Sequence, residues 1–90
     1  MLVDDVEVRS LRVFAAVLEA RHVGRAARAL GVGQPTASHH LKRLRGAFGD
    51  PLFVRDGQGL RPTPRALALE PRVRALLRAA DELAAPDALF

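Results

Sequence analysis

The chain has 90 residues, with 14 Lys and Arg against 10 Asp and Glu, and it contains no cysteine. A chain of this length holds a single hydrophobic core, and the lack of cysteine excludes a disulfide scaffold and thiolate metal sites. Its first residues lack the basic segment of a secretory signal, and no apolar run approaches the roughly 18 residues that a membrane span needs. We therefore expect one small globular domain, cytoplasmic and without a membrane part.

Positive charge is concentrated in the middle of the chain. The formal net charge is +4, whereas residues 25–65 carry eight basic and two acidic side chains and so contribute +6. Such a segment is typical of proteins that bind a polyanion, because each neutralised phosphate releases counterions. From charge alone, a solvated basic face without a partner is an equal alternative.

Two amphipathic helices are predicted in the first third of the chain. The first runs from about Glu7 to Arg21, and Asp4 and Asp5 are suited to capping its start. Its apolar stripe consists of Val8, Leu11, Phe14, Ala15 and Leu18. The second covers Gly24–Leu30 and ends at Gly31, with an inner face of Val23, Ala26, Ala27 and Leu30. We expect the core to come from Leu11, Phe14, Ala27, Leu30, Leu41 and Leu44.

A third helix is predicted from Gln34 to about Phe48, because proline is tolerated in a first helical turn. The short turn before it, Gly31 to Gly33, has the length that joins the helices of a helix-turn-helix. Its apolar stripe is Ala37, Leu41, Leu44 and Phe48. The opposite face carries Pro35, Thr36, His39, Lys42 and Arg43, with Ser38 near the boundary. Small polar groups followed by long cations suit a helix lying in the major groove of DNA.

The last third of the chain predicts a hairpin and a long helix. Leu52–Arg55 forms one strand, Asp56–Gly59 the turn, and Leu60–Pro62 the return. Thr63 then caps a helix that runs to about Leu83 or Ala84. Its seam consists of Leu69, Val73, Leu76, Ala80 and Leu83.

We favour this seam as a dimer contact over core packing, because the domain offers few elements to cover so long a helix. Pro71 lies inside the helix and should kink or strain it. The tail from Ala85 to Phe90 is expected to fray.

Other chemistries are poorly supported. His39 and His40 are adjacent on a helix and point about 100° apart, so they form no chelating pair, and we expect no metal and no cofactor. Ser38 beside His39 lacks an orienting acid and a pocket, so we expect no enzyme activity. Gly57 and Gly59 are explained by a hairpin turn and do not form a phosphate loop.

From Leu11 to Leu77 the chain resembles the DNA-binding domain of the LysR-type transcriptional regulators. The resemblance rests on Leu11–Phe14, Ala26-Ala27 with Leu30, Gln34–Ser38, Leu41–Leu44, Gly49–Phe53 with Arg55, Leu60–Thr63 and the helix that carries Pro71. It implies a mainly α fold, a winged helix-turn-helix with three helices and a small β-hairpin wing over residues 1–63. A linker and dimerisation helix with a tail then follows over residues 64–90. Family members also carry an effector-binding domain, so we expect this chain to correspond to the DNA-binding part alone.

The resemblance also implies site residues and partners. The expected base-reading residues are Gln34, Pro35, Thr36, Ser38 and His39. The expected DNA backbone and wing contacts are Arg9, Arg28, Lys42, Arg43, Arg55, Gln58 and Arg61. The expected partner is double-stranded DNA with a palindromic operator, bound by a homodimer through the last helix, with a tetramer in full-length forms.

Some positions depart from the family pattern. Gly24 and Gly33 stand where the family usually has a capping Ser or Thr, and His39 and Gln58 stand where Arg is common. The alternative function is a winged-helix dimerisation or protein-interaction module that binds no DNA.

Overall fold

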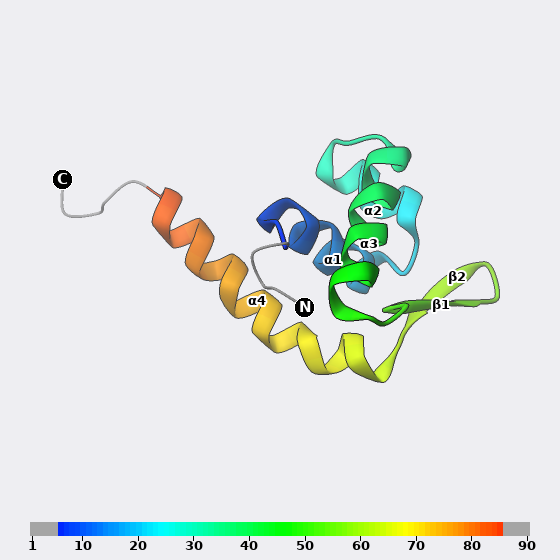
Figure 1. Cartoon of the computed structure of the whole chain (residues 1–90). Coiled ribbons are helices and arrows are strands. Elements are labelled where there is room, and N and C mark those ends of the chain that lie inside the picture. The colour runs from blue at the N-terminus through cyan, green and yellow to red at the C-terminus, as the bar shows by residue number, and fades with distance from the viewer. Residues whose placement is uncertain (1–5, 86–90) are drawn as a thin grey trace.

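The computed structural model describes residues 6–85, which form three packed helices, a two-stranded hairpin and a long final helix (Figure 1). The elements are α1 Val8–Ala20, α2 Val23–Leu30, α3 Gln34–Phe48, β1 Phe53–Asp56, β2 Gly59–Pro62 and α4 Pro64–Ala84. The hairpin projects from one side of the α1–α3 bundle, and α4 leads away from it on the other. The predicted winged helix-turn-helix architecture is confirmed.

The core lies where α1, α2 and α3 meet. Its buried residues from these helices are Leu11, Val13, Phe14, Val17, Leu18, Ala26, Ala27, Ala37, Leu41 and Leu44. From α2 only Ala26 and Ala27 are buried, and α2 packs against α3, where Ala37 is also buried. Because alanine is so small, the two helix backbones can approach closely, and a larger side chain there would overpack the contact.

Two residues that we expected to face the core lie at its margin. Leu30 is 37% exposed and Val8 is 43% exposed, whereas Val13 and Val17 of α1 are buried. The predicted stripe on α1 was too narrow, because α1 contacts α4 as well as α2 and α3. Leu30 is the last residue of α2, where the chain already turns away toward α3.

The capping predictions have mixed outcomes. Thr63 caps α4 as predicted, since its Oγ accepts a hydrogen bond from the Ala66 amide at 3.1 Å. The predicted capping residues Asp4 and Asp5 lie outside the described residues, and Glu7 is the N-cap of α1 without a side-chain bond. The frayed tail was predicted for residues of which only Ala85 is described.

A tight junction after α3 sets the directions of the hairpin and of α4. Leu52 has a φ of +66° although its side chain is fully buried, and the Phe53 amide bonds to the Pro51 carbonyl at 2.7 Å. Asp50 Oδ2 accepts hydrogen bonds from the Leu52 amide at 2.8 Å and from Thr63 Oγ at 2.7 Å. One carboxylate therefore connects the end of α3, the entry to β1 and the start of α4.

The hairpin is antiparallel, with Phe53 opposite Pro62 and Asp56 opposite Gly59. Its first strand begins one residue later than predicted, because Leu52 belongs to the tight turn. The Leu60 amide donates to the Arg21 carbonyl at 2.8 Å, which ties β2 to the end of α1. A Cβ at Gly59 would lie 3.0 Å from that carbonyl oxygen, so this close approach requires glycine.

Helix α4 has a packed half and a projecting half. It continues through Pro71 without interruption, although proline removes one helix hydrogen bond there. Val73 is 6% exposed and belongs to the core, whereas Leu83 is 89% exposed. An ion pair of 2.8 Å between Arg12 Nη2 and Asp81 Oδ1 connects α1 to the far half of α4.

We predict that Asp50→Ala lowers the free energy of unfolding by about 1–3 kcal/mol, because it removes two hydrogen bonds at a partly buried junction. Urea denaturation followed by circular dichroism measures the change. The control is Asp56→Ala, since this exposed carboxylate makes only a 3.9 Å contact with Arg61 and its loss should stay within about 0.5 kcal/mol. Equal destabilisation by both variants would contradict the role given to Asp50.

Candidate nucleic-acid interface

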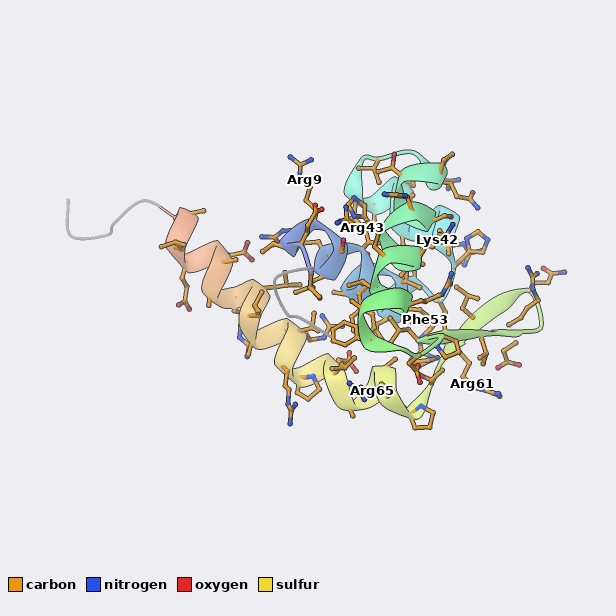
Figure 2. The ribbon with its side chains drawn as sticks, in the orientation of Figure 1. Arg9, Lys42, Arg43, Phe53, Arg61 and Arg65 are labelled. Carbon is orange, nitrogen blue, oxygen red and sulfur yellow. The ribbon has the colours of Figure 1, made fainter. Side chains whose placement is uncertain are left out.

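The outward face of α3 is exposed along its length. Burial of Ala37, Leu41 and Leu44 fixes the rotation of the helix against α1 and α2. Every residue predicted to read bases is therefore exposed, namely Gln34, Pro35, Thr36, Ser38 and His39. Lys42 and Arg43 follow on the next turn of the same helix (Figure 2). The helix thus presents short polar side chains at its start and cations further along.

The predicted backbone and wing residues come from all the surrounding elements and are all exposed. They are Arg9 on α1, Arg28 on α2, Lys42 and Arg43 on α3, and Arg55, Gln58 and Arg61 in the hairpin. Figure 2 shows Lys42 and Arg43 on α3 and Arg61 toward the hairpin. The exposed basic side chains thus come from α1, α2, α3 and the hairpin.

Carboxylates partly neutralise two of these cations. Arg43 Nη1 lies 2.8 Å from Glu7 Oε1, and Arg61 Nη1 lies 3.9 Å from Asp56 Oδ2. Within residues 6–85, Lys42 and Arg55 have no ion pair of this kind. A carboxylate therefore offsets the charge of Arg43, whereas within residues 6–85 no ion pair offsets that of Lys42 or Arg55.

The N-terminus of α2 is capped by a residue that the sequence did not single out. His22 is the N-cap, and its Nδ1 accepts a hydrogen bond from the Arg25 amide at 3.1 Å. The expectation that Gly24 occupies a capping position is wrong, because Gly24 lies inside α2. Gly33 is the N-cap of α3 and provides no side-chain bond, as expected. Histidine is not among the preferred capping residues, so its type gave no signal.

A shallow groove joins the hairpin to the start of α3. It is lined by His22, Gly24, Gln34, Arg55, Gln58 and Gly59, together with Val23 and Leu60. The hydrogen bond from β2 to Arg21 brings the hairpin to this position, directly before the cap of α2. Gln34 and the two hairpin residues, far apart in the sequence, therefore belong to one continuous surface.

His40 has a structural role on the other side of α3. Its Nδ1 lies 2.8 Å from Oγ of Ser10, which is buried in α1, and the two groups share a hydrogen bond. Among residues 6–85, no group of three His, Asp or Glu side chains could hold a metal ion. Over the same residues, no helix is both long and apolar enough to cross a bilayer.

Comparison with known proteins identifies the family. The sequence profile described as "Bacterial regulatory helix-turn-helix protein, lysR family" matches residues 8–67. The chain is 49% identical over 84 residues to the HTH-type transcriptional regulator LinR of Sphingobium indicum, covering 93% of this chain and 28% of that protein. It is 48% identical over 73 residues to the small neutral protease regulatory protein of Streptomyces coelicolor, covering 81% of this chain and 22% of that protein.

Solved structures agree with this family. A Corynebacterium glutamicum OxyR mutant matches with a TM-score of 0.84 and 31% identity, covering 87% of this chain and 25% of that one. The CbnR DNA-binding domain in complex with DNA matches with a TM-score of 0.80 and 31% identity, covering 87% and 90%. The BenM DNA-binding domain in complex with catB site 1 DNA matches with a TM-score of 0.80 and 29% identity, covering 87% of this chain and 88% of that one.

The fold and its exposed α3 are those of a bacterial regulatory helix-turn-helix protein. The chain belongs to the LysR family, a family of transcriptional regulators and not of enzymes, and it is a DNA-binding domain of that family. It spans about a quarter of the length of the curated relatives that it matches.

We predict that His22→Ala lowers the free energy of unfolding by about 1 kcal/mol, because the Arg25 amide loses its acceptor. His22→Asn keeps a capping acceptor and should restore most of the loss. Thermal or urea unfolding measures both variants, with His39→Ala as the matched control. His39 is exposed, so its truncation should change stability by no more than about 0.5 kcal/mol. A loss as large as that of His22→Ala would show that the cap contributes nothing particular.

Proposed function

We propose that α3 lies in the major groove of an operator and reads base edges through Gln34, Pro35, Thr36, Ser38 and His39. The observation that carries this proposal is the unobstructed outer face of α3, exposed from its first turn and continuous with the basic hairpin. A helix fits the major groove, where each base pair has its own pattern of donors and acceptors. The activity belongs in the cytoplasm, where bacterial DNA is found.

The chemistry of the first two turns suits direct reading of bases. The Gln34 amide can donate and accept together, which matches the two groups that adenine presents in the major groove. Ser38 bonds to either kind of group, and the Thr36 methyl can contact a thymine methyl. These side chains are short, so α3 can approach the base edges closely.

Cations on either side of α3 would hold the domain in register. We assign phosphate contacts to Arg9, Arg28, Lys42, Arg43, Arg55 and Arg61, with Gln58 at the hairpin tip. Such contacts position a protein without reading sequence. Since Glu7 neutralises Arg43, we expect Lys42 and Arg55 to contribute more.

A homodimer through α4 fits the surface of that helix. Leu76 is 44% exposed and Leu83 is 89% exposed, and an apolar groove between α1, α3 and α4 runs beside Leu76. Val73 is buried within the single chain, so we narrow the pairing surface to Leu76, Ala80 and Leu83, with partly buried Leu69 at its edge.

The division of the chain follows from this arrangement. We assign residues 1–63 to DNA binding and residues 64–90 to pairing. Two-fold pairing implies a palindromic operator with half-sites about one helical turn apart, because the symmetry of the DNA mirrors that of the dimer. A longer form of the chain would assemble such dimers into a tetramer.

We predict that reading and anchoring residues separate in DNA-binding measurements. Duplexes are first selected by the wild-type chain from a randomised pool and then compared with scrambled duplexes of the same composition. Gln34→Ala and Ser38→Ala should each reduce the preference for the selected duplex by about 1–3 kcal/mol, because base contacts carry the sequence information. Arg55→Ala should weaken binding to both duplexes alike. The negative slope of log affinity against log salt should become less steep by about 0.9.

Two outcomes would overturn this assignment. If Gln34→Ala weakens binding to the selected and the scrambled duplexes equally, α3 does not read bases. If the wild-type chain enriches no sequence from the pool, a protein-interaction module without DNA specificity becomes the better interpretation.

We predict that Leu76→Glu abolishes dimerisation while preserving the fold, because it places two symmetry-related carboxylates in an apolar contact. Sedimentation at tens of micromolar measures assembly, and circular dichroism checks folding. Ala75→Glu adds the same charge at a neighbouring exposed position outside the seam and should leave the dimer intact. A monomeric wild type, or a dimeric Leu76→Glu, would place the pairing surface elsewhere.

A further inference from the structure

Gly24, at the start of α2, lies close to the side chains of His22 and Gln34. A Cβ built on Gly24 would lie 3.0 Å from Cε1 of His22 and 3.2 Å from Oε1 of Gln34. Both distances are shorter than ordinary van der Waals contacts, so each neighbour would have to shift by a few tenths of an ångström. The imidazole of the α2 cap and the amide of the first α3 residue therefore both pack against the bare backbone of Gly24.

The two neighbours differ in their freedom to move. The His22 ring is held by the hydrogen bond from the Arg25 amide to its Nδ1, and moving the ring would weaken that cap. Gln34 is exposed, and no hydrogen bond joins its side chain to another of residues 6–85. A Cβ at position 24 would therefore press on both groups, straining the His22 cap and pushing aside the Gln34 amide, which no hydrogen bond within residues 6–85 holds in place.

The surroundings of this contact are fixed. The hydrogen bond between Leu60 and the Arg21 carbonyl holds the hairpin next to the α2 cap, so Arg55 and Gln58 line the same groove as Gln34. The Gln34 amide is thus bounded by α2 on one side and faces the hairpin across the groove. Its contact with Gly24 is the point at which α2 can influence where that amide lies.

We propose that Gly24 is a specificity-determining residue, because its lack of a Cβ sets the position from which the Gln34 amide meets a base. Gly24 is a positioning residue that acts through Gln34, so the inference rests on the proposed base-reading role of Gln34. Glycine is a poorer helix former than alanine, so a purely structural view expects Gly24→Ala to stabilise the chain and leave DNA preference unchanged.

The experiment combines Gly24→Ala and Gln34→Ala in a double-mutant cycle. The probes are duplexes selected by the wild-type chain from a randomised pool and their scrambled counterparts. Gly24→Ala should reduce the ratio of the two affinities about fivefold, which is part of the discrimination that one good base contact supplies. In the Gln34→Ala background, Gly24→Ala should produce no further loss, because the side chain through which it acts is absent.

A matched glycine provides the control. Gly46 lies inside α3 with nothing within 4 Å of its added Cβ, so Gly46→Ala should raise helix stability and keep the wild-type preference. The side-chain amide resonances of Gln34, followed by NMR in the free protein, give a second measurement. They should shift in Gly24→Ala and stay in place in Gly46→Ala.

The outcomes separate this inference from the proposed function. If Gln34→Ala reduces the preference and Gly24→Ala does not, the inference fails and the proposed function stands. A loss from Gly24→Ala that persists in the Gln34→Ala background also overturns it. If Gln34→Ala leaves the preference unchanged, the base-reading role fails and the inference fails with it.

Discussion

The Asp50 carboxylate is the interaction on which the arrangement of the three parts depends. It bonds to the Leu52 amide and to the Thr63 hydroxyl, and Thr63 in turn caps α4. Leu52 adopts a left-handed backbone that is unfavourable for a branched side chain, and its complete burial offsets that cost. This junction links the directions of the hairpin and of α4 to the end of α3.

The exposure of the polar face of α3 follows from packing with small residues. Ala26 and Ala27 of α2 and Ala37 of α3 are buried, and the two helices are in contact, so the polar face of α3 points outward. At the start of α2, His22 and Gly24 extend this close packing to the side chain of Gln34. Helix packing therefore determines both which face of α3 is exposed and how one of its side chains lies.

Helix α4 has a buried part and an exposed part along one apolar seam. Its first half completes the core through Val73, and its second half leaves Leu76 and Leu83 exposed. Because fold and proposed pairing use different turns of the helix, a charge at Leu76 should separate the dimer without unfolding the domain. The ion pair between Arg12 and Asp81 steadies the projecting half on the outside of α1.

The sequence by itself determined the helices, the hairpin and the outward face of α3. Periodic leucines, alanines and glycines specify these features locally, so α3 was predicted from Gln34 to Phe48 as observed. Tertiary structure decided what depends on residues distant in the sequence. The exposure of Leu30, the turn at Leu52 and the pairing of Arg43 with Glu7 are of this kind.

The same division applies to the α2 cap and the α4 seam. The residue type of His22 carries no capping signal, and the contact of Gln34 with Gly24 requires the turn between α2 and α3 to close. The heptad pattern of α4 is equally compatible with core and interface, and only the packing of α4 against the rest of the domain assigns Val73 to the core. The periodicity of the sequence shows which side of a helix is apolar. Only the three-dimensional packing decides whether the core of the same chain or another molecule covers that side.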